Sequence, residues 1–77
     1  MKVEVRLIAF IQKYAPEDKS VFKMEFKKGA TVTTVVEELG IPDTEPRLTL
    51  LNGIHAKDDA VLKDSDKLLL LTPIEGG

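Results

Sequence analysis

The sequence predicts an α+β fold, in which a mixed sheet of four to five strands has one main helix packed across it. Two segments near the amino terminus alternate apolar and polar residues, as strands with one buried face do. A central segment spaces its apolar residues as a helix does. Two further apolar segments follow, so that strands precede and follow the helix, and this order favours a mixed sheet.

The first predicted strand occupies the start of the chain. Val3, Val5 and Leu7 alternate with charged residues, so their side chains would share one buried face. Around Phe10 the spacing changes toward a helical turn, which Pro16 limits because proline lacks the N–H that a helix needs. We therefore expect a strand that ends in a short turn.

The second predicted strand follows a polar loop at residues 17–20. Phe22, Met24 and Phe26 alternate with charged residues. The two strands can pair antiparallel, although their connection is longer than a tight hairpin. Both phenylalanines of this strand are expected in the hydrophobic core, and so is Phe10.

The central helix is the clearest element of the sequence. Thr31 is its predicted N-cap, and Gly40 is the predicted left-handed residue just past its end. Pro42 prevents continuation. Because β-branched residues have weak helix propensity, this helix should depend on docking against the sheet. Its apolar stripe consists of Val32, Val35, Val36 and Leu39.

A β-hairpin is predicted after the helix. Residues 48–51 form a short apolar strand, and Asn52-Gly53 is the strongest hairpin signal in the chain, expected as a type I′ turn. Residues 54–56 return. His55 is the single histidine, and we interpret it as a solvated strand residue, because no cysteine or second histidine could share a metal with it.

The last predicted strand, residues 68–72, follows a polar turn at residues 63–67. Its four consecutive leucines suggest an interior strand that is covered on both faces, or one face of which is left for a partner. In the turn, Asp64 and Asp66 lack the spacing of a calcium loop, so turn chemistry is the better interpretation. The order of elements is that of a ubiquitin-like β-grasp fold, with the first and last strands parallel and central.

Composition limits the classes of function. With 77 residues, 43% of them hydrophobic, the chain is expected to form one small globular domain. It has no cysteine, which fits a reducing, cytoplasmic location and excludes thiolate nucleophiles. We expect no signal peptide and no membrane span, and the net charge of −2 with mixed signs does not favour nucleic acid as a partner. No catalytic triad or phosphate-binding loop is evident, so we expect a non-catalytic protein.

The sequence ends in two glycines after an apolar segment. We divide the chain into a β-grasp domain at residues 1–72 and a flexible tail at residues 73–77. Glycine has high backbone entropy and no side chain, so Gly76 and Gly77 suit a thin tail better than a packed element. The candidate reacting group is therefore the carboxylate of Gly77, which partner proteins would activate. No cofactor or metal is expected on the chain itself.

A protein that presents such a tail must also expose some apolar surface beside it. The candidate partner-binding residues are Leu71, Pro73 and Ile74. Pro73 should in addition limit the backbone just upstream of the glycines, which reduces the freedom lost when the tail enters a partner.

The second half of the chain resembles a known family. Residues 51–53 (LNG), 62–68 (LKDSDKL) and 71–77 (LTPIEGG) are similar to the small sulfur-carrier subunit of molybdopterin synthase and to the thiazole-pathway sulfur carrier. That family often has glycine where this chain has Ser65, and paired prolines where Thr72 precedes a single proline. The turn after the first strand looks more like the molybdopterin branch.

The resemblance implies a sulfur carrier in molybdenum or tungsten cofactor biosynthesis. An adenylating activating enzyme would use ATP on the Gly77 carboxylate, and a sulfur donor protein would convert the adenylate to a thiocarboxylate. The large subunit of molybdopterin synthase would then receive the sulfur on a pterin precursor. The same tail also suits a protein modifier that forms isopeptide bonds, a carrier for thiamin thiazole or tRNA thiolation, or an inert interaction module.

Overall fold

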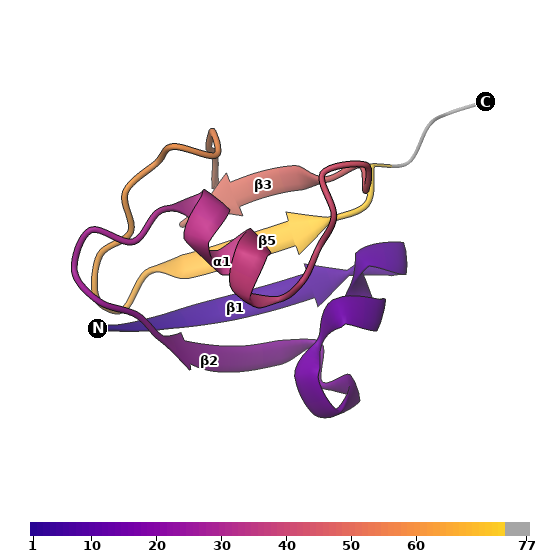
Figure 1. The fold of residues 1–77 in the computed structure, drawn as a ribbon, viewed down its shortest axis with the longest axis horizontal. Coiled ribbons are helices and arrows are strands. Elements are labelled where there is room, and N and C mark those ends of the chain that lie inside the picture. Colours follow the sequence, from indigo (N-terminus) through magenta and orange to yellow (C-terminus); the bar gives the residue numbers. More distant parts are fainter. Residues whose placement is uncertain (74–77) are drawn as a thin grey trace.

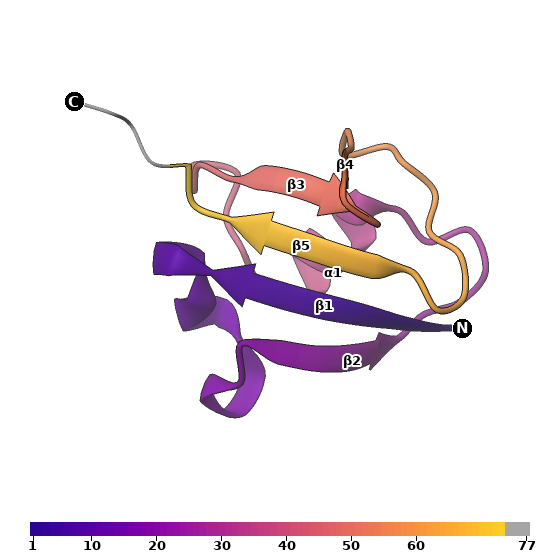
Figure 2. The same cartoon turned by 180° about the vertical axis from the view of Figure 1, so that it is seen from behind.

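One helix lies across one face of a five-stranded mixed sheet (Figures 1 and 2). The structure, a computed structural model, describes residues 1–73 of the chain. The strand order is β2-β1-β5-β3-β4. In chain order the elements are β1 (Lys2–Ile8), the 3₁₀ helices η1 (Ala9–Tyr14) and η2 (Pro16–Asp18), β2 (Val21–Glu25), α1 (Val32–Glu38), β3 (Leu48–Leu51), β4 (Ile54–His55) and β5 (Lys67–Leu71).

β1 and β5 form the centre of the sheet and run parallel, with Val5 opposite Leu68. β1 also pairs antiparallel with β2, and β5 pairs antiparallel with β3. This confirms the predicted ubiquitin-like β-grasp arrangement. β3 and β4 form the predicted hairpin, in which Asn52 and Gly53 both have positive φ angles of 52° and 83°, as a type I′ turn requires.

The hydrophobic core lies between α1 and the sheet face that it covers. From α1, Val32 and Val35 are fully buried and Val36 is 3% exposed, as predicted, whereas Leu39, the fourth residue of the predicted stripe, is half-buried at the C-cap. Removing these valines from water stabilises a helix whose residues form helices poorly by themselves. The side chains that β1 and β5 contribute to this core are Val3, Val5, Leu7, Leu68 and Leu70.

Both ends of α1 are closed as the sequence predicts. At the N-cap, the backbone N–H of Thr31 donates to Thr34 Oγ1 at 3.0 Å. At the other end, Gly40 has a φ of 73°, and the N–H of Ile41 donates to the Val36 carbonyl at 3.1 Å. This is a Schellman-type end, in which Ile41 folds back onto the last turn and is 5% exposed. Within residues 1–73, every helix is too short or too polar to cross a membrane.

One core assignment is wrong: Phe10 is 79% exposed. β1 ends at Ile8, and Ala9 takes a left-handed φ of 67°, which starts the 3₁₀ helix η1. The change of backbone direction gives the buried position to Ile11, which is fully enclosed, and leaves Phe10 on the surface. Of the other two phenylalanines, Phe26 is buried and Phe22 is half-buried.

Candidate functional site

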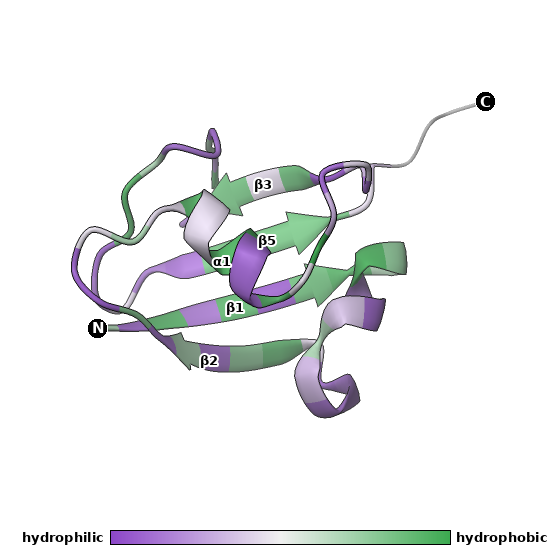
Figure 3. Ribbon diagram, in the orientation of Figure 1, coloured by the Kyte–Doolittle hydropathy of each residue, from purple (hydrophilic) through white to green (hydrophobic). Residues whose placement is uncertain are grey.

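The face of the sheet that α1 leaves uncovered is apolar at one end. There Leu71 lies between Ile8 of β1 and Leu48 of β3, and we call these three residues the apolar row. Ile8 is 41% exposed, and the two leucines are half-buried. Because side chains alternate along a strand, the row faces away from Leu70 and the core. Figure 3 shows the hydrophobic colouring where β1 and β5 end and β3 begins.

The same face becomes polar toward the opposite end of the sheet. Two residues along the strands from the apolar row, on the same face, Leu69 lies between Arg6 and Leu50. Two residues further along, Glu4 lies between Lys23 and Lys67, a cross-strand arrangement of opposite charges. The open face therefore has an apolar end, where β5 finishes, and a charged end, where β5 begins.

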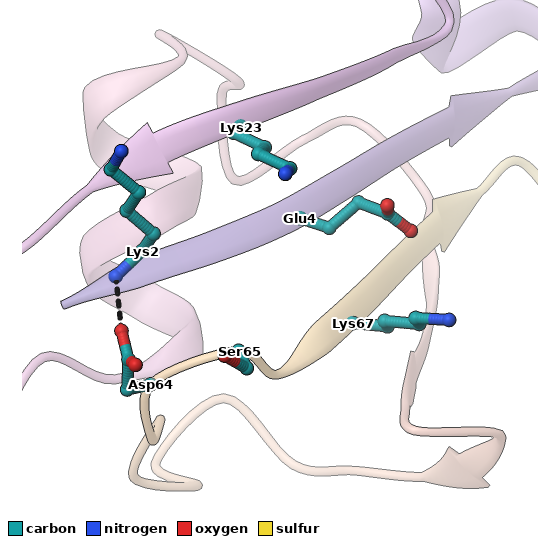
Figure 4. A pocket seen from close by; sticks show the side chains of 6 residues that line it. All are labelled: Lys2, Glu4, Lys23, Asp64, Ser65 and Lys67. Atoms are coloured by element: carbon teal, nitrogen blue, oxygen red, sulfur yellow. Dashed lines mark hydrogen bonds between the residues drawn. The ribbon is translucent and has the colours of Figure 1, made fainter.

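The charged end contains a shallow hollow of about 270 Å³. Figure 4 shows that the ammonium groups around it do not point to a common centre, so they do not form a pocket for a single anion. The residues that line the hollow are Lys2, Glu4, Lys23, Asp64, Ser65 and Lys67.

The two aspartates in the turn before β5 are structural. Asp64 Oδ1 accepts the backbone N–H of Lys2 at 2.7 Å, and Asp66 Oδ2 accepts that of Lys63 at 2.7 Å. Asp66 Oδ1 also accepts from the side-chain amide of Asn52 at 2.9 Å. Turn chemistry thus accounts for these carboxylates, and within residues 1–73 no group of three or more His, Asp or Glu side chains is placed to hold a metal ion.

The chain beyond β5 is tied to the end of β1. The N–H of Thr72 donates to the Ile8 carbonyl at 3.3 Å, which extends the parallel ladder by one residue. Thr72 Oγ1 accepts the backbone N–H of Ile11 at 2.9 Å, which joins the start of the tail to η1. Pro73 is exposed. The position at which the tail leaves the sheet is therefore fixed by two hydrogen bonds.

η1 is also held at its far end. Tyr14 Oη donates to Glu45 Oε2 at 2.9 Å, and Lys13 Nζ lies 3.5 Å from the same oxygen. Glu45 belongs to the loop between α1 and β3. Partial removal of the phenol from water, together with the hydrogen bond to this carboxylate, raises the pKa of Tyr14 above its ordinary value of 10.0.

The structure places two of the predicted site residues and leaves the others outside the described region. Leu71 lies in the apolar row, and Pro73 follows it on the surface. Ile74, Gly76 and Gly77 lie outside residues 1–73. Sequence reasoning missed the two neighbours of Leu71 in the apolar row, because strand register, which only the folded sheet reveals, brings them together.

Solved structures of similar fold were found for the whole chain. SAMP1 from Haloferax volcanii, a small archaeal modifier protein, is 21% identical over 100% of both chains, with a TM-score of 0.81. A putative molybdopterin converting factor subunit 1 from Pyrococcus furiosus is 23% identical over 95% of this chain and 98% of its own, with a TM-score of 0.79.

A third similar structure is a complex of subunits 1 and 2 of the molybdopterin-converting factor from Helicobacter pylori. It is 24% identical over 100% of both chains, with a TM-score of 0.66. At these identities the likeness establishes the fold, which the molybdopterin converting factor subunit 1 and the archaeal modifier protein share.

A comparison with curated protein sequences finds no significant match. The profile of the family described as Mut7-C ubiquitin, in contrast, matches residues 1–75, nearly the entire chain. The five-stranded β-grasp sheet with α1 across it agrees with this match, and the chain belongs to the Mut7-C ubiquitin family.

Proposed function

We propose that the chain is a sulfur carrier whose Gly77 carboxylate is activated by partner proteins, and that it serves molybdopterin biosynthesis. The observation that carries the proposal is the fixed exit of the tail beside the apolar row, where Thr72 is hydrogen-bonded to both β1 and η1. A partner that takes the tail meets an exposed apolar surface at a constant position. The likeness to subunit 1 of the molybdopterin converting factor supports this reading.

The proposed chemistry follows from the poor reactivity of a carboxylate. In the adenylating enzyme, an oxygen of the Gly77 carboxylate attacks the α-phosphorus of ATP and pyrophosphate leaves. A persulfide of the sulfur donor then attacks the carbonyl carbon and AMP leaves. A thiol reduces the remaining S–S bond, so that the thiocarboxylate stays on Gly77. The partners supply the acid, base and oxyanion groups, and the chain supplies the reacting atoms.

In this proposal, residues 1–72 form the β-grasp domain that binds the partners, and residues 73–77 form the tail that carries the reacting carboxylate. Thr72 is the last residue with hydrogen bonds to the sheet and η1 among those described, which supports a boundary after it. The apolar row and Pro73 are the proposed contact surface for the adenylating enzyme and for the large synthase subunit, with Ile74 continuing it. A cytoplasmic location suits this persulfide chemistry, because thiols stay reduced there.

The test is the intact mass of the chain purified from its own cells at its natural level. A sulfur carrier gains the mass of one oxygen-to-sulfur exchange, and the fragment that carries it contains Gly77. Gly77→Ala should lose the modified form, because its methyl group lies next to the reacting carbon. Ile54→Ala is the control: its side chain is 73% exposed in the edge strand β4, so the variant should keep the modified form. A wild-type chain with an unmodified carboxylate in growing cells contradicts the proposal.

A protein modifier is the second candidate, and the fold of the archaeal modifier SAMP1 favours it. Its signature is a diglycine remnant on lysines of other proteins, with the Gly77 carbonyl in an amide bond. The pathway can be assigned by deletion of the gene: loss of molybdoenzyme activity, a thiazole requirement, or loss of thiolated tRNA would each identify a different sulfur acceptor.

A further inference from the structure

Phe10 is the most exposed large apolar side chain among the residues that the structure describes. Its exposed fraction is 79%, against 73% for Ile54 on the β3–β4 hairpin and 41% for Ile8. An aromatic side chain of this size gains most when it is removed from water at an interface, and aromatic residues are enriched among the residues that dominate binding energy. The exposure of Phe10 is therefore typical of a residue that contacts a partner protein.

The backbone that carries Phe10 is held firmly. Ile11, the next residue, is fully buried and donates its N–H to Thr72 Oγ1 at 2.9 Å. At the end of η1, Tyr14 is hydrogen-bonded to Glu45 at 2.9 Å. An aromatic group on a fixed backbone loses less freedom on docking than one on a loose loop, so its contact area contributes more fully to affinity.

Phe10 also lies beside the start of the tail. η1 follows Ile8, a member of the apolar row, and is joined to Thr72 directly. Both views of the fold show η1 at the same end of the sheet as the end of β5 (Figures 1 and 2). Phe10 therefore belongs to the apolar end of the sheet, close to the point where the tail begins.

The length of the tail limits where a partner can work. Five residues separate Thr72 from the end of the sequence, and a fully extended chain spans at most about 3.3–3.6 Å per residue, or roughly 17 Å in all. An enzyme that encloses the Gly77 carboxylate must therefore cover the end of the sheet as well. η1 belongs to that end, so the enzyme's surface reaches it.

We propose that Phe10 docks in an apolar pocket of the adenylating enzyme, beside the slot that admits residues 73–77. The proposal rests on the proposed function, since it takes the ATP-dependent enzyme as the partner. In it, Phe10 and the apolar row together set the affinity for that enzyme, and Phe10 does not touch the reacting atoms.

The experiment measures ATP–pyrophosphate exchange with the enzyme fraction, isolated from the source cells, whose exchange depends on added wild-type chain. We expect Phe10→Ser to raise the KM for the chain about tenfold while kcat stays within about twofold, because the contact acts on binding. Ile54→Ser is the matched control, as Ile54 is similarly exposed but lies in the edge strand β4. It should keep the wild-type KM.

Phe10→Leu keeps part of the apolar area, so its KM should lie between the values for the wild type and for Phe10→Ser. Circular dichroism melts establish whether each variant is folded. If Phe10→Ser does not fold, the KM of Phe10→Leu is compared with that of Ile54→Ser instead. Equal KM values for the Phe10 and Ile54 variants overturn the docking proposal and leave the carrier function standing. If no fraction shows exchange that depends on the wild-type chain, the proposed function fails and the docking proposal fails with it.

Discussion

The four leucines of β5 are chemically identical, yet the two faces of the sheet use them differently. Leu68 and Leu70 face α1 and are 1% and 0% exposed. Leu69 and Leu71 face the open side and are only half-buried, each flanked by side chains from β1 and β3. One face stabilises the fold, and the other keeps an apolar surface next to the tail.

The difference arises from what covers each face. The valine stripe of α1 closes one side, whereas no helix of residues 1–73 crosses the other (Figure 2). A leucine on an uncovered face remains partly in water and contributes less to stability than a buried one. Several such leucines side by side are typical of a surface that another protein covers. β5 is an interior strand, as predicted, but only one of its faces is covered, so its burial on both faces is not observed.

The sharpest way to test the contrast is to shorten a leucine on each face. Leu70→Ala removes a fully buried side chain and should lower the free energy of unfolding by about 2–5 kcal/mol. Leu69→Ala is the matched variant and should lower it by less than about 1.5 kcal/mol, because its side chain already meets water. Urea unfolding followed by circular dichroism measures both. Equal losses would show that the faces are energetically equivalent.

A charge on the apolar row should affect partner binding. Leu71→Asp introduces a carboxylate between Ile8 and Leu48, and we expect it to raise the KM for the chain about tenfold in the exchange assay. Ile74→Asp, on the predicted contact surface, should act in the same direction. Ile54→Asp, in β4, serves as the control. An unchanged KM for Leu71→Asp in a folded protein would remove the apolar row from the interface.

The turn that leads into β5 offers a change that leaves the hydrophobic core and the apolar row intact. Ser65 adopts a left-handed φ of 70°, a conformation that glycine adopts without steric cost and that strains residues with a Cβ atom. Ser65→Gly should therefore raise the free energy of unfolding by about 0.5–1 kcal/mol, less the greater entropy that glycine gives the unfolded chain. The exchange kinetics should not change. A lower urea midpoint would show that the serine hydroxyl stabilises the turn more than the strain destabilises it.

The smallest expected effect concerns the hydrogen bond between Tyr14 and Glu45 at the end of η1. The pKa of Tyr14 is raised in the folded protein, so the folded state keeps this proton more strongly than the unfolded state does. Its contribution to stability is fully present below the unfolded pKa of 10.0 and is lost as the pH rises through the higher folded value. Tyr14→Phe should lack this part of the alkaline decline. Urea unfolding at a series of pH values from about 9 to 11 compares the two.

Much of the fold was predictable because local rules and packing agree. Alternation defined β1, helical spacing defined α1, and Asn52-Gly53 defined the hairpin. Phe10 was misplaced because periodicity does not reveal where a backbone turns, and the positive φ of Ala9 has no signal in the sequence. The sulfur-carrier family that the second half of the chain resembles often has glycine at the position of Ser65, and the φ of 70° gives that preference a physical reason.

The sequence predicted only those residues of the candidate site that lie next to the glycines along the chain. Leu71 and Pro73 could be chosen because they precede the glycines. Ile8 and Leu48 are distant from them in sequence and become neighbours through parallel and antiparallel pairing with β5. The hydrogen bond from Ile11 to Thr72 joins segments 61 residues apart. Contacts of this kind depend on register, which composition and spacing leave open.

The pairing of the first strand with the last has a consequence during synthesis. β1 finds its central neighbour only when β5 has emerged from the ribosome, so a nascent chain cannot complete its sheet early. A chain that stops before β5 would lack the interior strand of the sheet and would be open to proteolysis. Only a polypeptide that already includes β5 can therefore assemble a stable sheet.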